Sequence, residues 1–193
     1  MNILIAAASW MEVKLLADEL YLLGKKNKAL TEFQHAGNKI AILITGIGTT
    51  YATFRLTSIL LQHEYQMVLN TGITGSLNRD LTIGEVVNVI SEQFADWGIE
   101  QKDEFLTLFE ADFIGLNDFP FENGMLRATE SNGWIPWKEV NGITTNKSPG
   151  NISSINEINR KFGADVESTE GAAIFFVTKH LGIPCFEIKA VSN

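Results

Sequence analysis

The residues of this sequence that are best suited to chemistry follow or end segments expected to be strands. Five short polar or glycine-containing segments have this position: residues 9–16, 45–48, 70–77, 165–175 and 189–193. Open α/β sheets bind ligands at the carboxyl ends of their strands, where such segments meet. The segments carry the carboxylates of Glu12 and Glu170 and the amide of Asn193. Carboxylates can activate water or hold hydroxyl groups, and an amide can donate hydrogen bonds, so we predict a binding site at this edge of the sheet.

Several common catalytic and binding motifs are absent from the sequence. Residues 46–51 lack the third glycine of a dinucleotide fingerprint, and residues 72–76 lack the length and the lysine of a phosphate-binding loop. The histidines His35, His63 and His180 have no partners at metal-ligand spacing. No serine lies in the G-x-S-x-G context of an acyl hydrolase. The sequence therefore predicts neither a cofactor nor a metal.

Alternating strand and helix patterns predict the fold that positions these segments. Apolar runs predict strands at residues 2–8, 40–45, 67–70, 85–91 and 184–191. Helical spacing of apolar residues predicts helices at residues 10–23, 49–62, 151–162 and 169–181, the first of which ends at Gly24. This alternation is typical of a three-layer α/β fold with a central mixed sheet flanked by helices. Residues 100–132 show little periodicity and are predicted to form a loop or a flap.

Composition limits the size of the fold and its partners. A chain of 193 residues that is 45% hydrophobic predicts one domain over residues 1–193. The net charge of -8 and the pI near 4.9 disfavour nucleic acid and anionic membranes. The only cysteine, Cys185, lies in an apolar run and allows no disulfide, which suits the cytoplasm. We expect neither a signal peptide nor a membrane span, because there is no positively charged leader and no run of about 18 apolar residues.

The five segments occur in the order found in the purine nucleoside phosphorylase superfamily, which contains phosphorylases and nucleosidases. The sequence resembles this superfamily over essentially its whole length, through SWMEVKLL, TGIG, NTGITGSL, DVESTEGAAIF and KAVSN. Each motif is short, and it is their common order that makes the resemblance specific. The forms ESTEGAA and FADWG are particularly similar to futalosine hydrolases.

The resemblance implies roles for residues of the first four segments. Glu12 matches the glutamate that activates the attacking water, and Glu170 matches the glutamate that holds the ribose hydroxyls. Gly46 and Gly72 belong to the two turns that shape the ribose and nucleophile pocket. Thr169 stands where the superfamily commonly has a methionine packed against the sugar.

The resemblance implies that the last segment, residues 189–193, binds the purine base. Lys189, Ser192 and Asn193 match a basic residue, a serine, and an acid or amide that contacts the purine ring. An aspartate at the last position accepts from the exocyclic amine of adenine, whereas an asparagine amide donates to O6 and N7 of a 6-oxopurine. Asn193 therefore favours hypoxanthine as the leaving base.

Cleavage of an N-ribosidic bond passes through an oxocarbenium-like state. Such a state needs a carboxylate to activate water, hydrogen bonds to the ribose hydroxyls and a donor for the departing base. Phosphorolytic members of the superfamily hold phosphate with arginines near the first strand turn and after a middle strand. The first arginine here is Arg55, inside a predicted helix, so water is the favoured nucleophile.

The resemblance to futalosine hydrolases implies a nucleosidase that releases hypoxanthine from futalosine, in menaquinone biosynthesis, and it implies a homodimer. We expect this enzyme to be cytoplasmic. A 5'-methylthioadenosine or S-adenosylhomocysteine nucleosidase is the first alternative. The second is a nucleoside-binding protein without activity, because the sequence stops after a strand expected to be central and we expect the final helix to be missing. A glutamate near a helix start also often only complements the helix dipole, and this structural role stays open for Glu12 and Glu170.

Overall fold

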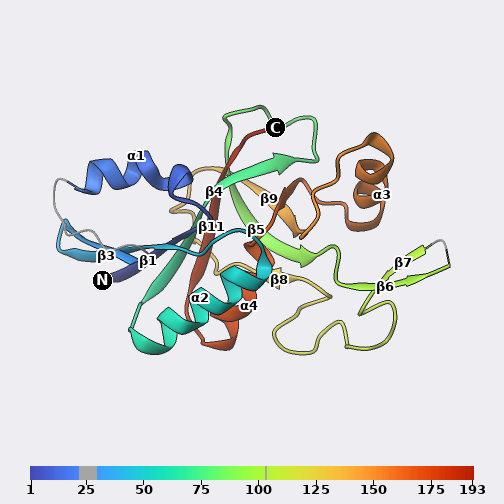
Figure 1. Ribbon diagram of the computed structural model, residues 1–193, viewed down its shortest axis with the longest axis horizontal. Coiled ribbons are helices and arrows are strands. Elements are labelled where there is room, and N and C mark those ends of the chain that lie inside the picture. The colour runs from blue at the N-terminus through green and yellow to red at the C-terminus, as the bar shows by residue number, and fades with distance from the viewer. Residues whose placement is uncertain (22–29, 103) are drawn as a thin grey trace.

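The computed structural model describes residues 1–21, 30–102 and 104–193, which form a central sheet with helices on both faces (Figure 1). The elements in chain order are β1 (Asn2–Ala7), α1 (Trp10–Tyr21), β2 (Leu30–His35), β3 (Asn38–Ile44), α2 (Thr49–Gln62), β4 (Met67–Ser76), β5 (Val86–Phe94), β6 (Gly98–Gln101), β7 (Glu104–Thr107), β8 (Leu126–Arg127), β9 (Lys138–Thr144), α3 (Ile152–Phe162), β10 (Val166–Ser168), α4 (Gly171–His180) and β11 (Cys185–Val191). Over the described residues the main sheet has the order β10-β9-β5-β11-β4-β1-β3-β2, β8 pairs with β5, and β6 and β7 form a separate hairpin.

The main sheet is mixed, and its pairing brings four strand ends to one edge. β1 pairs in parallel with β3 and β4, and β11 pairs in parallel with β4 but antiparallel to β5. β10 pairs with β9 and also with β4, which closes β4, β11, β5, β9 and β10 into a ring. The carboxyl ends of β1, β3, β4 and β11 therefore point the same way.

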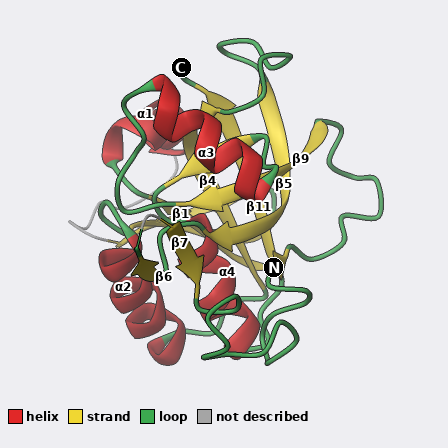
Figure 2. Ribbon diagram, turned by 90° about the vertical axis from the view of Figure 1, so that its right-hand side faces the viewer, coloured by secondary structure: helices red, strands yellow, loops and turns green. Residues whose placement is uncertain are grey.

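The side chains of β1 show how the two faces of the sheet are covered. Leu4 and Ala6 are buried in a core cluster that also contains residues of α2 and α4. Ile5 and Ala7 are buried in a second cluster with Val13 of α1. In Figure 2, α1 lies on one side of the sheet and α2 and α4 lie on the other. β1 is apolar on successive residues because both of its faces are covered.

The predicted fold class is confirmed, and most predicted elements are present. α2 spans the predicted residues 49–62, and β11 is the central strand that the sequence predicts. α3 begins after Asn151, whose side chain accepts a hydrogen bond from Ser154 N at 2.9 Å and caps the helix. The predicted end of the first helix, at residues 22–24, lies outside the described residues.

The sequence patterns do not predict β2, β9 and β10, and they misplace several boundaries: β5 continues to Phe94 rather than residue 91, and α4 begins at Gly171 rather than residue 169. β4 continues to Ser76, so most of residues 70–77 forms strand where a glycine turn is expected. The reason is β11, which pairs with this stretch and keeps it extended. The pairing begins with Cys185 opposite Val68 and ends with Val191 opposite Thr74. Residues 100–132 contain β7, β8 and the end of β6, so the prediction of a purely irregular segment is wrong in part.

Candidate active site

A cavity of about 540 Å³ lies at the carboxyl ends of β1, β4 and β11. All five segments singled out in the sequence contribute to its lining, although they are far apart in the chain. Five of the predicted site residues line it, namely Glu12, Thr169, Glu170, Ser192 and Asn193. The two glutamates and the asparagine on which the enzymatic interpretation depends therefore share one cavity.

Glu12 is held at the start of α1 by two backbone donors. Ser9 N donates to Glu12 Oε2 at 2.7 Å, which is one of the two bonds of a capping box, and Ile73 N donates to Oε1 at 3.3 Å. These bonds fix the carboxylate between the end of β1 and the end of β4. A carboxylate has about four acceptor positions, so Glu12 keeps capacity to accept a further proton or hydrogen bond.

Gly72 lies directly beside Glu12 but is not among the residues that line the cavity. A Cβ atom at this position would lie 2.6 Å from Glu12 Oε1, and the φ angle of +150° is one that other residues rarely adopt. Glycine is therefore required here so that the carboxylate can lie against the strand.

Glu170 joins the start of α4 to the turn after β3. Its Oε1 accepts from Gly48 N at 2.8 Å and from the hydroxyl of Thr169, and the residue is only 5% exposed. Gly46 precedes this contact with a φ of +85° and packs against Tyr51, outside the cavity lining. The contact fixes the position of Glu170 relative to residues 46–48.

Lys189 does not line the cavity with Ser192 and Asn193. It is 2% exposed, and its Nζ lies 3.3 Å from Asn70 Oδ1 and 3.7 Å from Glu187 Oε1. Asn70 Nδ2 in turn donates to Glu187 Oε1 at 2.9 Å. Lys189 thus belongs to a buried polar network that supports β4 and β11 from within the fold.

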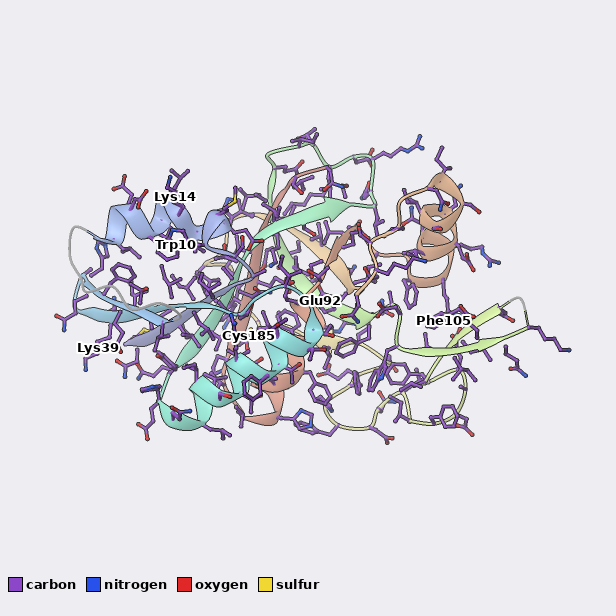
Figure 3. The ribbon with its side chains drawn as sticks, viewed as in Figure 1. Trp10, Lys14, Lys39, Glu92, Phe105 and Cys185 are labelled. Carbon is purple, nitrogen blue, oxygen red and sulfur yellow. The ribbon has the colours of Figure 1, made fainter. Side chains whose placement is uncertain are left out.

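Two buried glutamates of the site region are not singled out by the sequence motifs. Glu92 of β5 and Glu187 of β11 are 1% and 0% exposed. Figure 3 labels Glu92 in the interior of the molecule. Thr144 Oγ1 donates to Glu92 Oε2 at 2.8 Å and accepts from Ala172 N at 2.7 Å, which ties Glu92 to α4. A signal is present in the sequence, because each glutamate interrupts an apolar strand.

Burial changes the protonation of this pair. Burial raises the pKa of Glu187 to about 7, although the charge of Lys189 opposes the shift. Burial and the nearby Glu187 raise the pKa of Glu92 well above its usual value. The two carboxyl groups share one lysine, so the neutral form of at least one of them is favoured over two buried negative charges.

Because Gly171, the first residue of α4, has no side chain, the carboxyl groups of Glu92 and Glu187 can lie next to its Cα. A Cβ there would lie 2.4 Å from Glu92 Oε1 and 2.9 Å from Glu187 Oε1, and neither side chain can move into solvent. We expect Gly171→Ala to lower the free energy of unfolding by about 1–3 kcal/mol, despite the better helix propensity of alanine. Urea denaturation measures this change. Gly150→Ala is the matched control, because a Cβ at Gly150 meets nothing within 4 Å; equal effects of the two substitutions would contradict the crowding at Gly171.

The lining of the cavity bears on its possible ligands. None of the described lining residues is lysine, arginine or histidine.

Within residues 1–21, 30–102 and 104–193, no group of three or more histidine, cysteine or acidic side chains is placed to hold a metal ion. No helix in the described part of the chain is long and apolar enough to cross a membrane.

The fold and the residues around the cavity agree with a single family. The model of the phosphorylase superfamily matches residues 2–193, and the chain belongs to this superfamily.

The chain is similar to proteins named as nucleosidases and to one named futalosine hydrolase. It is 24% identical over 155 residues to an aminodeoxyfutalosine nucleosidase of Helicobacter pylori, an alignment that covers 80% of this chain and 67% of the relative. It is 28% identical over 129 residues to futalosine hydrolase of Streptomyces coelicolor, which covers 67% of this chain and 54% of the relative. A shorter match, 33% over 90 residues, relates 45% of the chain to 39% of a 5'-methylthioadenosine/S-adenosylhomocysteine nucleosidase of Bacillus thuringiensis. The chain thus aligns with about half of the futalosine hydrolase.

Solved structures show the same fold over the whole chain. A futalosine hydrolase mutant of Helicobacter pylori has a TM-score of 0.84 at 21% identity, covering 100% of this chain and 86% of that one. A 5'-methylthioadenosine/S-adenosylhomocysteine nucleosidase of Campylobacter jejuni has a TM-score of 0.82 at 21% identity, with the same coverage. The central mixed sheet and its flanking helices are therefore those of the nucleosidases of this superfamily.

Proposed function

We propose that this protein hydrolyses the N-ribosidic bond of a 6-oxopurine nucleoside, and that its substrate is futalosine. The observation that carries the proposal is the single cavity lined by Glu12, Glu170 and Asn193. The kinship with an aminodeoxyfutalosine nucleosidase and a futalosine hydrolase supports it.

The reaction assigns one task to each of these side chains. Glu12 accepts a proton from a water molecule as the water oxygen bonds to C1' of the ribose. The bond between C1' and N9 breaks, and its electron pair leaves with the base. Glu170 holds the ribose hydroxyls, and the amide of Asn193 donates to O6 and N7, where negative charge develops. Proton uptake from solvent completes the release of hypoxanthine.

Water is the nucleophile in this proposal because the cavity offers no counter-charge for phosphate. The described lining residues include Glu12, Glu167 and Glu170 but no basic side chain. A phosphate dianion placed among these acids would be repelled, whereas water carries no charge to compensate.

Chromatography of the products from futalosine, inosine and 5'-methylthioadenosine tests the proposal. We expect hypoxanthine and the dehypoxanthine product from futalosine, and little or no adenine from 5'-methylthioadenosine. Addition of phosphate should leave the rate unchanged, because a hydrolase has no use for it.

The second candidate function is a 5'-methylthioadenosine/S-adenosylhomocysteine nucleosidase. The 33% identity over 90 residues to the relative of that name favours it. Release of adenine from 5'-methylthioadenosine with futalosine untouched would establish this candidate in place of the first. Binding of nucleosides without release of any base would leave a binding protein.

We further propose a cytoplasmic homodimer that acts in menaquinone biosynthesis. The dimer is expected from the superfamily resemblance. Sedimentation equilibrium tests it directly: the proposal requires a mass of twice 21.4 kDa.

A further inference from the structure

One carboxylate in the cavity has no task in the reaction described above. Glu167 of β10 lines the cavity together with Glu12 and Asn193. Ser148 Oγ donates to Glu167 Oε1 at 2.7 Å, while Glu167 Oε2 is buried and accepts no hydrogen bond from the described residues. A buried acceptor without a donor destabilises the structure that contains it. Glu167 therefore lines the cavity with one of its two acceptor oxygens unpaired among the described residues.

The amide of Asn193 lies next to this carboxylate. A Cβ atom added to Gly75 would lie 3.0 Å from Glu167 Oε1 and 3.5 Å from Asn193 Nδ2. An acceptor and a donor thus flank the same point of β4. Ser192 Oγ lies 2.8 Å from Asn193 Oδ1, the nearer of its two acceptors, and donation of its proton there leaves Nδ2 as the free end of the amide.

The edge of a 6-oxopurine is complementary to this pair. Hypoxanthine presents the N1–H donor next to the O6 acceptor, whereas adenine presents the N1 acceptor next to an amine donor. A carboxylate opposite N1 accepts from hypoxanthine but sets two acceptors against each other with adenine.

We propose that Glu167 selects the base, by accepting the N1–H of a 6-oxopurine while Asn193 donates to O6. Glu167 is then a specificity-determining residue that rejects adenine. This inference rests on the proposed function, because it assumes that the base lies at the Glu167 side of the cavity and the ribose at the Glu12 and Glu170 side.

Calorimetric binding of free bases to the full chain tests the proposal without catalysis. We expect hypoxanthine to bind about 10- to 100-fold more tightly than 1-methylhypoxanthine, which lacks the N1 proton, and than adenine. Glu167→Ala removes the acceptor and makes room for the methyl group, so both ratios should fall to about one. Glu167→Gln should give intermediate ratios, since a neutral amide oxygen accepts more weakly. Glu139→Gln, at an exposed glutamate of β9, is the control and should behave as the wild type.

Several results would overturn the selection by Glu167. Equal binding of hypoxanthine and 1-methylhypoxanthine by the wild type does so without any variant, and so does an unchanged ratio in Glu167→Ala. Failure to bind hypoxanthine at about 1 mM has the same meaning. If the wild type needs the N1 proton for binding but releases no base from any nucleoside, the hydrolytic function fails and base selection stands. If the wild type releases hypoxanthine from a nucleoside but binds 1-methylhypoxanthine as tightly as hypoxanthine, base selection by Glu167 fails and the hydrolytic function stands.

Discussion

Glu12→Gln is expected to lower kcat for nucleoside hydrolysis by about 10²- to 10⁴-fold, the usual contribution of a general base. The amide oxygen can still accept the shorter of the two hydrogen bonds that hold the side chain, from Ser9 N at 2.7 Å, and only the longer one, from Ile73 N at 3.3 Å, is lost. The amide cannot take a proton from water. We therefore expect the variant to fold and to bind hypoxanthine as the wild type does, and initial rates of hypoxanthine release measure the loss.

Glu19→Gln provides the matched control for this substitution. Glu19 lies in the same helix, α1, and is exposed outside the cavity. Glu19→Gln should leave the rate of hydrolysis within about twofold of the wild type, because a substitution on the surface, away from the cavity, has little effect. A Glu12→Gln protein that keeps most of its rate would mean that another group activates the water, and the role given to Glu12 would be wrong.

Stability should fall as pH rises from about 4.5 to about 7, through the titration of Glu187. The folded-state pKa of Glu187, about 7, lies above the usual value of 4.5, so the folded protein binds this proton more tightly than the unfolded chain does. The stabilisation that this proton gives the folded protein is fully present below pH 4.5 and is lost as pH rises through 7. A difference of this size corresponds to about 3 kcal/mol. Glu92, whose pKa is also raised, contributes in the same direction.

Comparison with Glu187→Gln isolates this contribution from all other titrations. The substituted amide oxygen can still accept from Asn70 Nδ2, and the side chain no longer ionises. The free energy of unfolding is measured by urea denaturation at a series of pH values. Between pH 4.5 and pH 7.5 its value for the variant should rise by about 3 kcal/mol relative to that of the wild type. Parallel pH profiles for the two proteins would rule out a raised pKa at Glu187.

The fold could be predicted largely because its central elements carry clear periodic patterns. β1 and β11 are apolar runs covered on both faces, and α2 has a regular apolar stripe. β2 and β9 carry weaker signals: β2 lies at the edge of the sheet and four of its six residues are polar, and Gly142 and Asn141 interrupt β9. Their positions depend on pairing with distant strands, which no local pattern encodes.

The candidate site was predictable where its residues end strands. Glu12, Glu170 and Asn193 lie in short polar segments, and parallel pairing brings those segments to one edge. The buried network was not predictable in the same way. Lys189 looks like a ligand-binding cation in sequence, but its strand register turns it toward Asn70 and Glu187. Glu167 resembles a residue that only flanks a helix, and its place in the cavity depends on the pairing of β10 with β4.

The position of β11 sets an order for the assembly of the protein during synthesis. β11 separates β4 from β5 in the sheet, yet it follows both of them in the chain by about a hundred residues. While a ribosome is still adding residues beyond α3, one edge of β4 and one edge of β5 have no strand to pair with. Such open edges are templates for association with other chains. The growing polypeptide therefore keeps these two strand edges open to other chains until its last described strand emerges.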